Sequence, residues 1–571
     1  MPKAATISIA ETLSLLDGDF RAFAQGVAEG RYAFWLGSGI SLFRYPGLKE
    51  IIIKALEYLR TRVDHTQNTC PFKKALVRAY GIADLSADER DSIDLTLAVE
   101  DWPLADLLKE RLSGKYAQFL NIDVDDEPLD LMIWDAVNVV GTYANDDVMP
   151  DAEHYAIAVL VKEGLVRELP SANWDGLIEK ATRELSGDND GLKICVRSED
   201  LQAPDQKATL TKFHGCAVRA RDDEALYRPY LVGAQRQIDG WATDAKVAGL
   251  VQHLIDVAIS KPTLLLGFSA QDANIRTIFA LAADKQSWDW PGDLPAYVMA
   301  EEAVGEAQTA LLANVYRNQF AGADRAQIKT SAHLQAYAKP LLTALLLWTY
   351  AAKLQRTARL GTFDLSDELA AWVDEGVILL RDQMAAANTG NHLAFVEALI
   401  GGLSRGKRLF LAGRSDPTTT RYEALSPIPL SQMDQNVETE TDGTPEAAVI
   451  AATLAKGVHV GDWTLRPTLN TDDRAGVAEL TSGGRTNRVF MVGKPDAELA
   501  LHDSEAVLED DEDAILIHAR SIHERMQRSP TRAPGRTGGP VGPRRVSMAS
   551  LIAEVAEPSA LMERFKQEAG L

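Results

Sequence analysis

Four short segments of the sequence combine glycines with polar residues, and each follows an apolar run. The first is Gly37-Ser38-Gly39-Ile40-Ser41, which comes directly after the apolar residues 32–36 and precedes a predicted helix at 47–56. Glycines in such a turn let the backbone approach a phosphate, and a helix N-terminus offers free N–H groups. The segment therefore predicts a phosphate cradle, although the glycines of such a turn can also serve the backbone alone.

The second and third segments carry side chains that could act on a hydroxyl group or on water. Asn173 and Asp175 lie in the segment 171–179, and His214 lies in Lys212-Phe213-His214-Gly215. An amide can orient a hydroxyl or a water through its donor and its acceptor, and a neutral histidine can serve as a base. Two simpler interpretations stay open: Asn173 and Asp175 could be turn and N-cap residues, and His214 a polar residue at a strand end.

The fourth segment is Leu266-Gly267-Phe268-Ser269-Ala270-Gln271-Asp272, which again follows an apolar run. Gly267 and Ser269 could contact a ligand, but Ser269 could also be only a turn residue. Asp272 is expected to cap the helix that follows, whatever else it does.

Strands that alternate with helices must hold these segments. Helical periodicity predicts helices at 48–62, 174–185, 247–258 and 274–283, and apolar runs predict strands at 32–36, 165–169, 194–196, 209–213, 263–266 and 296–300. Such alternation is typical of an α/β fold with a doubly wound, Rossmann-like parallel sheet, which binds ligands at the carboxyl ends of its strands. All four segments fall there. The acidic stretch of about 60–150 predicts a helical insertion, and helix is expected again from 331 to 359.

Residues 1–355 are accordingly predicted as one domain, and residues 356–571 as a second, α+β region. The second region has helical patterns near 364–386 and 392–403, and strand-like runs at 408–412, 489–492 and 514–518. A polar loop is expected at 415–445, a solvated acidic turn at 509–513, and a flexible basic Pro/Gly/Arg arm at 528–545. A short helix is expected from 547.

Composition limits the classes of protein that the chain can represent. The 571 residues are enough for about two to four domains. The formal net charge of −23 disfavours a protein that coats DNA with its whole surface. The three cysteines, Cys70, Cys195 and Cys216, form no disulfide framework or metal half-site, which favours a reducing compartment. No secretion signal is visible and the longest apolar stretch, 341–352, is too short to span a bilayer, so we expect a cytoplasmic protein without a membrane.

The order and spacing of the four segments resemble the sirtuin (silent information regulator) family, specifically its bacterial branch of NAD-consuming defence proteins. Family patterns of the type G-A-G-I-S, T-x-N-x-D, K-x-H-G and G-[TF]-S have counterparts here in the same order, over about residues 25–305. The resemblance implies that Gly37, Ser38, Gly39 and Ser41 hold a pyrophosphate and that Asn173 and Asp175 lie beside the nicotinamide ribose. It also implies that His214 is the catalytic histidine, with Asn173 assisting, and that Gly267, Ser269 and Asp272 lie toward the adenosine.

The resemblance implies an NAD glycohydrolase that releases nicotinamide and ADP-ribose, with NAD as substrate and no metal. Cleavage of this bond passes through an oxocarbenium-like sugar, and the leaving group is already cationic, so the site needs a base and oriented polar groups rather than a strong acid. Protein-deacylating sirtuins carry a four-cysteine zinc module between the catalytic histidine and the last motif, where this chain has only Cys216. An NAD-dependent protein deacylase and a non-catalytic NAD or ADP-ribose sensor remain the alternatives.

An NAD-depleting enzyme of antiphage defence, acting by abortive infection, must be inactive until it is triggered. The region 356–571 is therefore expected to bind a partner or to form a homo-oligomer. In related systems the partner is a short Argonaute protein or a hexameric DNA-translocating ATPase. The arm at 528–545 could contact nucleic acid through its phosphates, or could be only a linker.

Overall fold

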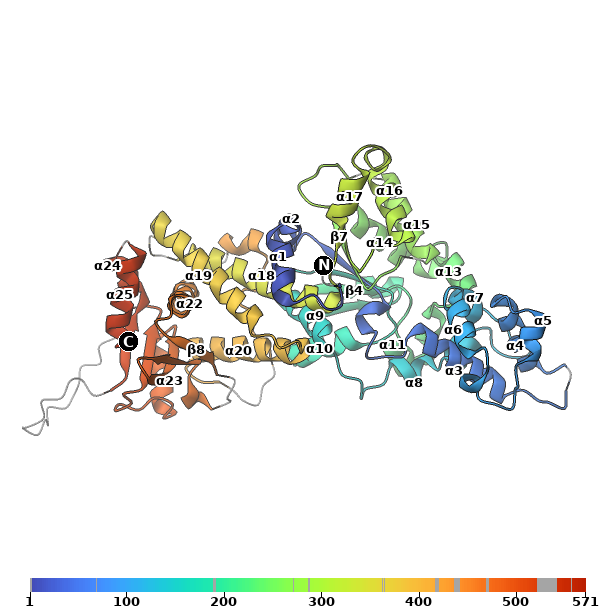
Figure 1. Cartoon of the computed structure of the whole chain (residues 1–571), viewed down its shortest axis with the longest axis horizontal. Coiled ribbons are helices and arrows are strands. Elements are labelled where there is room, and N and C mark those ends of the chain that lie inside the picture. The colour runs from blue at the N-terminus through green and yellow to red at the C-terminus, as the bar shows by residue number, and fades with distance from the viewer. Residues whose placement is uncertain are drawn as a thin grey trace, which may run out of the picture.

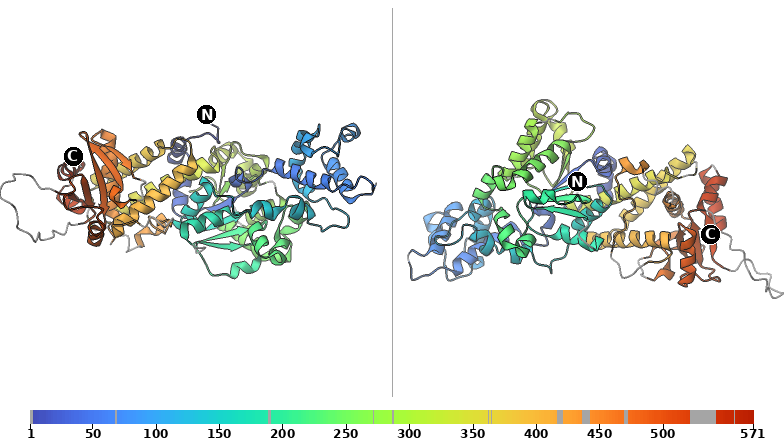
Figure 2. Two further views of the ribbon diagram at one scale, coloured as in Figure 1. Left: turned by 90° about the horizontal axis from the view of Figure 1, so that it is seen from below. Right: turned by 180° about the vertical axis from the view of Figure 1, so that it is seen from behind.

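The computed structural model describes residues 3–67, 69–187, 191–270, 272–285, 288–361, 363, 365–415, 421–435, 442–468, 472–520, 542–555 and 557–571. The molecule is elongated. A sheet covered by helices forms the middle, a helical insertion forms one end, and a smaller sheet with its own helices forms the other end (Figures 1 and 2).

Seven parallel strands form the central sheet in the order β3-β4-β2-β1-β5-β6-β7. Their bounds are β1 Ala33–Leu36, β2 Glu168–Ser171, β3 Leu192–Cys195, β4 Ala208–Lys212, β5 Thr263–Leu266, β6 Tyr297–Ala300 and β7 His333–Leu334. This arrangement confirms the predicted α/β fold. Two details of the prediction were wrong. The strand expected at 165–169 begins at Glu168, and β7 lies within residues 331–359, which were predicted to be helical. A strand of two residues is too short to show a periodic pattern in the sequence, so β7 is recognised by its pairing with β6.

Both faces of the sheet are covered by helices. Phe34 and Leu36 of β1 point into one core, and Ala33 and Trp35 point into the other, because successive strand residues face opposite sides. The first core is covered by α1 Ile9–Asp17, α2 Arg21–Ala28, α9 Ala152–Lys162, α10 Leu177–Ser186 and α18 Ala338–Ala358. The second is covered by α13 Gln235–Trp241, α14 Ala248–Ser260, α15 Ala273–Lys285, α16 Glu306–Ala321 and α17 Arg325–Ala332. Burial on both faces explains why the strands are continuously apolar.

The insertion between β1 and β2 is helical, as predicted, and has a core of its own. Its helices are α3 Leu48–Thr61, α4 Pro71–Ile82, α5 Ala87–Asp91, α6 Ala105–Ser113, α7 Tyr116–Leu120 and α8 Val139–Tyr143. Two helices that follow β4, α11 Ala217–Asp222 and α12 Glu224–Tyr227, add Ala217, Ala220 and Tyr227 to this core. The insertion is therefore packed against the end of the sheet where β4 terminates.

A second, five-stranded sheet lies in the C-terminal region, in the order β12-β11-β10-β9-β8. Its strands are β8 Thr464–Pro467, β9 Ala478–Ser482, β10 Arg485–Val492, β11 Ala514–His518 and β12 Arg544–Ser547. β11 pairs in parallel with β10 and with β12, and β9 pairs antiparallel with β10 and with β8. The helices of the region are α19 Asp367–Ala386, α20 His392–Ala412, α22 Thr444–Val460, α23 Pro495–Asp503, α24 Met548–Glu554 and α25 Pro558–Ala569.

Three predictions for the C-terminal region need correction. Residues 408–412 are the last turn of α20 rather than a strand, because Leu409 and Phe410 continue the buried stripe of that helix. The expected loop 415–445 contains a 3-10 turn at Leu430–Gln435 and the start of α22. Residues 528–541 of the expected arm lie outside the described residues, and its last two residues, Arg544 and Arg545, belong to β12.

Helix α18 joins the two regions. It contacts α1 and α9 beside the central sheet, and α19 and α22 in the C-terminal region. Its apolar stretch, 341–352, is largely buried, and the predicted domain boundary at 355/356 falls inside the helix. Among the residues that the structure describes, no helix is long and apolar enough to cross a membrane.

Candidate functional site

The four segments singled out in the sequence meet at one edge of the central sheet. They follow β1, β2, β4 and β5, and the carboxyl ends of parallel strands lie on the same side. β1 lies between β2 and β5, so the turns after β1 and β5 leave the sheet next to each other. This is the position where doubly wound sheets bind ligands.

Three of the predicted glycines allow the turns after β1 and β5 to cross in contact. The Gly39 N–H donates to the Gly267 carbonyl at 3.1 Å, and a Cβ added at Gly39 would lie only 2.6 Å from the Gly267 Cα. A Cβ at Gly37 would meet the Gly267 backbone as well, and Gly267 has a φ of +57°. The glycines therefore serve the crossing of the two turns, whereas Ser38 and the backbone of Gly39 are exposed. Residues 38–41 form a single 3-10 turn, and α3 begins only at Leu48.

Ser41 is the centre of a buried polar cluster that contains both Asn173 and Asp175. The Ser41 hydroxyl donates to Asp175 Oδ2 at 3.0 Å and accepts from Asn173 Nδ2 at 3.4 Å. The Nε2 atom of His154, in the first turn of α9, lies 3.2 Å from the same Ser41 oxygen. Sequence segments 132 residues apart are thus joined through one hydroxyl group.

The Asn173 side chain has one atom without a partner. Asn173 is only 6% exposed, its backbone N–H donates to Ser171 Oγ, and its Nδ2 donates to Ser41. Its Oδ1 has no hydrogen-bond partner in the described structure. A buried acceptor without a partner costs free energy, about 1–3 kcal/mol, unless a ligand or a water supplies the donor. The atom therefore marks the place where a hydroxyl donor would fit.

A buried lysine holds the loop that carries Asn173 and Asp175. Lys212 Nζ donates to the carbonyl oxygen of Asp175 and, at 2.8 Å, to Glu179 Oε1. Burial alone lowers the pKa of Lys212, but Cys216, Glu179 and Asp175 outweigh it, so its pKa lies above its ordinary value. The charged ammonium group is therefore a permanent support beneath the loop. Asp175 Oδ1 also accepts the N–H of Leu177, so the simpler interpretation of Asp175 as a turn residue holds beside its bond to Ser41.

His214 lies in a neighbouring set of hydrogen bonds. Its Nε2 lies 2.8 Å from Asn274 Nδ2, and its backbone carbonyl accepts from the Trp174 indole. Burial lowers the pKa of His214, although the Asp272 carboxylate and the Asn274 amide act in the opposite direction. The imidazole is therefore neutral at pH 7, as a general base must be. Within the described residues, no hydrogen bond joins its side chain to Asn173 or Ser41.

Asp272, whose carboxylate raises the pKa of His214 against burial, has contacts of its own. Its carboxylate accepts a hydrogen bond from the Tyr116 hydroxyl of α7, and its carbonyl accepts the N–H of Arg276 in α15. Asp272 thereby links the turn after β5 to the helical insertion, which a helix-capping residue alone would not do.

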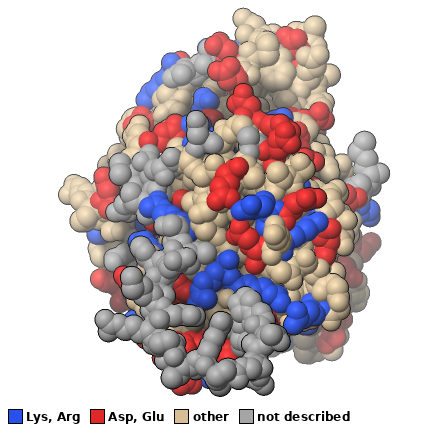
Figure 3. Space-filling view, turned by 90° about the vertical axis from the view of Figure 1, so that its left-hand side faces the viewer, with Lys and Arg blue, Asp and Glu red and all other residues tan. Residues whose placement is uncertain are grey.

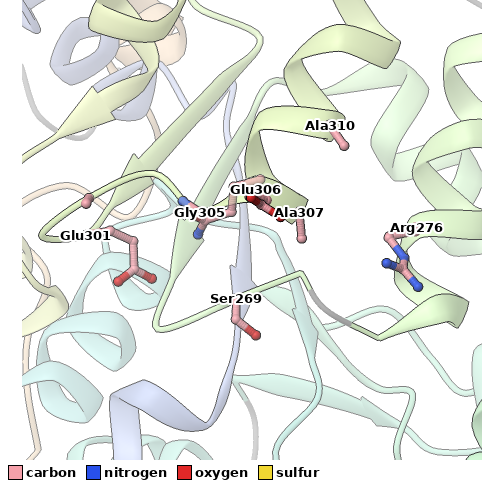
Figure 4. A pocket seen from close by; sticks show the side chains of 9 residues that line it. Ser269, Arg276, Glu301, Gly305, Glu306, Ala307 and Ala310 are labelled. Carbon is pink, nitrogen blue, oxygen red and sulfur yellow. Dashed lines mark hydrogen bonds between the residues drawn. The ribbon is translucent and has the colours of Figure 1, made fainter. Parts of the chain in front are cut away.

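A pocket of about 650 Å³ opens at the carboxyl ends of β5 and β6. Ser269, which is exposed, lies in its middle, with Glu301 and Arg276 on opposite sides of it (Figure 4). The first turn of α16 closes the pocket, where Gln308 Nε2 donates to the Phe268 carbonyl at 2.9 Å. The volume lies within the range of pockets that bind small ligands, about 300–1,000 Å³.

Sequence reasoning missed three residues of this site: His154, Asn274 and Glu301. Asn274 lies two residues after Asp272, and Glu301 directly follows β6, so position relative to a strand end could have indicated both. His154 carries no such signal, because it lies within an apolar helix and 113 residues from Ser41.

Comparison with known protein families supports a sirtuin-like assignment for part of the chain. The family profile described as SIR2-like domain matches residues 167–317, a range that includes Asn173, Asp175, His214 and Gly267, whereas Gly37–Ser41 precede it. No curated protein matches the chain significantly. No group of three or more His, Cys, Asp or Glu side chains suited to a metal ion occurs in the described part of the chain. The match supports a sirtuin-like family for this part of the molecule and is consistent with an enzyme that uses NAD.

Proposed function

We propose that the chain is an NAD hydrolase that cleaves the bond between nicotinamide and ribose. The observation that carries the proposal is the unpartnered Oδ1 of Asn173, held in a buried cluster at the ligand-binding edge of a SIR2-like domain. A ribose hydroxyl or the attacking water supplies the donor that this oxygen lacks.

The residues suit hydrolysis as follows. The bond between ribose C1′ and the nicotinamide nitrogen breaks with its electron pair going to the nitrogen, which neutralises the leaving nicotinamide. A water oxygen bonds to C1′, and its proton goes to Nε2 of His214, the unprotonated ring nitrogen, which gives up the hydrogen bond from Asn274 as it accepts the proton. The Asp175 carboxylate, 7% exposed, is on the same loop as Asn173 and would stabilise the positive charge that develops on the sugar. The pocket around Ser269 takes the adenosine end, where Glu301 can accept from ribose hydroxyls.

The two alternatives have less support. A deacylase would need the zinc module that supports the acyl-peptide platform, whereas Cys70, Cys195 and Cys216 of this chain are free and buried. A sensor that binds without turnover needs no base, whereas His214 is buried and has a lowered pKa.

The proposal includes a triggered role in antiphage defence, with the C-terminal region as the place where a partner or a second copy binds. Figure 3 shows the end of the molecule that this region forms, where Lys and Arg side chains lie among Asp and Glu side chains. Among the side chains of the described residues, this mixture favours a protein partner over direct contact with nucleic acid, which binds best to surfaces of positive charge alone. A short Argonaute protein or a DNA-translocating ATPase would fit that part of the proposal.

The test is NAD loss followed by mass spectrometry, without any peptide. The control variant is His459→Ala, because His459 is exposed on α22. Wild type and this control are expected to release nicotinamide and ADP-ribose at the same rate. His214→Ala is expected to release neither product. If wild type is inactive, co-purifying partners and nucleic acid are added, then an acyl-peptide. Turnover that requires the acyl-peptide would establish a deacylase, and tight NAD binding without turnover under every condition would establish a sensor.

A further inference from the structure

His154 uses both ring nitrogens although it is completely buried. Its Nδ1 accepts the backbone N–H of Asp151 at 3.1 Å, which closes the capping box at the start of α9. Its Nε2 lies 3.2 Å from the Ser41 hydroxyl oxygen. The exposed fraction of the side chain is 0%. A histidine that only capped the helix would need the first contact and not the second.

The bond from Asp151 decides which nitrogen carries the proton. A backbone N–H can only donate, so Nδ1 must be unprotonated and Nε2 must carry the proton of the neutral ring. Burial lowers the pKa of His154 to about 3, although the Asp151 carboxylate acts to raise it. The ring therefore stays neutral throughout the physiological pH range. His154 is therefore a fixed donor to Ser41.

The groups around Ser41 together fix the direction of each of its hydrogen bonds. The Asp175 carboxylate can only accept, so the Ser41 proton goes to Asp175 Oδ2, 3.0 Å away, and the fixed His154 donor occupies one of the two lone pairs of the Ser41 oxygen. The only role left for Ser41 toward Asn173 is that of acceptor, so Asn173 must turn its Nδ2 to Ser41, at 3.4 Å. The Oδ1 of Asn173 is then left free.

We propose that His154 is a positioning residue, which orients the Ser41 hydroxyl and, through it, presents Asn173 Oδ1 to NAD. This inference rests on the proposed function, because it assigns NAD as the ligand that Asn173 meets. It extends the site to α9, outside the range that the SIR2-like profile matches.

Two substitutions of His154, to glutamine and to leucine, distinguish the effect of its hydrogen bonds from the effect of the space that its ring fills. His154→Gln can keep both bonds, because its oxygen can accept from Asp151 and its amide nitrogen can donate to Ser41. His154→Leu fills similar space and keeps neither. Ile157→Ala is the matched control: Ile157 lies on the same helix, is fully buried in the core beneath the sheet, and has an apolar side chain that can make no hydrogen bond. It tests whether lost helix packing alone affects the site.

The experiment measures kcat and KM for nicotinamide release, with Ser41→Ala completing a double-mutant cycle. We expect His154→Leu to lower kcat about tenfold with little change in KM, the loss of one oriented hydrogen bond. His154→Gln should recover to within about threefold of wild type, and Ile157→Ala should match wild-type kcat. The double variant Ser41→Ala/His154→Leu should be no slower than Ser41→Ala alone, because His154 acts only through Ser41.

Additive losses in the cycle, or wild-type kcat for His154→Leu, would overturn the proposal. If wild type releases no nicotinamide under any condition, the proposed hydrolysis fails separately, and the same cycle is then measured as NAD affinity by calorimetry. Coupling between positions 41 and 154 in that affinity would support the positioning role, whereas additivity or an absence of NAD binding would overturn it.

Discussion

Replacing Lys353 with methionine is expected to release the segment 422–426 from the central domain. Lys353, on α18, has no exposed surface and donates to the Glu163 carbonyl at 2.8 Å, to Glu163 Oε2 at 2.6 Å and to the Ser426 carbonyl at 2.5 Å. Glu163 follows the last residue of α9, so this ion pair joins the helix that carries His154 to the C-terminal region. Burial lowers the pKa of Lys353, while Glu163 opposes that shift.

The size of the effect follows from what remains around Glu163. Removing one partner of a buried ion pair costs about 3–5 kcal/mol, because the other charge is left without compensation. The Glu163 carboxylate keeps three donors, the Tyr422 hydroxyl at 2.5 Å and the N–H groups of Leu425 at 2.7 Å and Ser426 at 3.3 Å. The cost should therefore be near the lower limit, about 3 kcal/mol, which corresponds to about a hundredfold change in a local opening equilibrium.

Hydrogen exchange followed by mass spectrometry measures this effect locally. A single unfolding free energy is not well defined for a chain with several cores, whereas exchange reports each segment separately. The Leu425 and Ser426 amides should exchange about a hundredfold faster in Lys353→Met, and peptides of β5 should not change. Lys407→Met is the control, because Lys407 donates to the Ala424 carbonyl of the same segment at 2.5 Å without touching Glu163. Exchange within threefold of wild type, or an equal effect of Lys407→Met, would refute the reasoning.

Three further predictions concern the site itself. Gly267→Ala should abolish NAD binding, because φ at this position is +57° and the new Cβ would lie 2.6 Å from the Gly39 Cα; calorimetry that finds wild-type affinity would contradict this. Asn173→Ala should lower turnover about 10²–10³-fold with an unchanged circular dichroism spectrum, as does loss of an oriented polar group elsewhere, and wild-type turnover would make Asn173 a simple turn residue. NAD turnover should be half-lost only below pH 6.5, because the pKa of His214 is lowered from its ordinary value and only the neutral imidazole can accept a proton. A rate that is half-lost at pH 7 or above would remove His214 as the base.

Much of the fold could be predicted because its signals are local. The strands at 263–266 and 514–518 were predicted with the bounds that the structure has, since continuous apolar runs bounded by polar residues or glycine are typical of buried strands. Residues 408–412 show the limit of such signals. The same apolar run suits a strand or a buried helix, and only the packing of Leu409 and Phe410 decides for the helix. The two-residue β7 exists only because β6 lies beside it.

The candidate site divides in the same way. The positions of Gly37, Asn173, His214 and Gly267 after strands could be predicted from the sequence, and parallel strands place their carboxyl ends together. That Ser41 joins Asn173 to Asp175, and that a histidine 113 residues away from Ser41 contacts its hydroxyl group, became visible in the folded structure alone. A strand end is encoded by its neighbours in the chain, whereas a hydrogen bond between distant side chains depends on where packing sets each helix against the sheet.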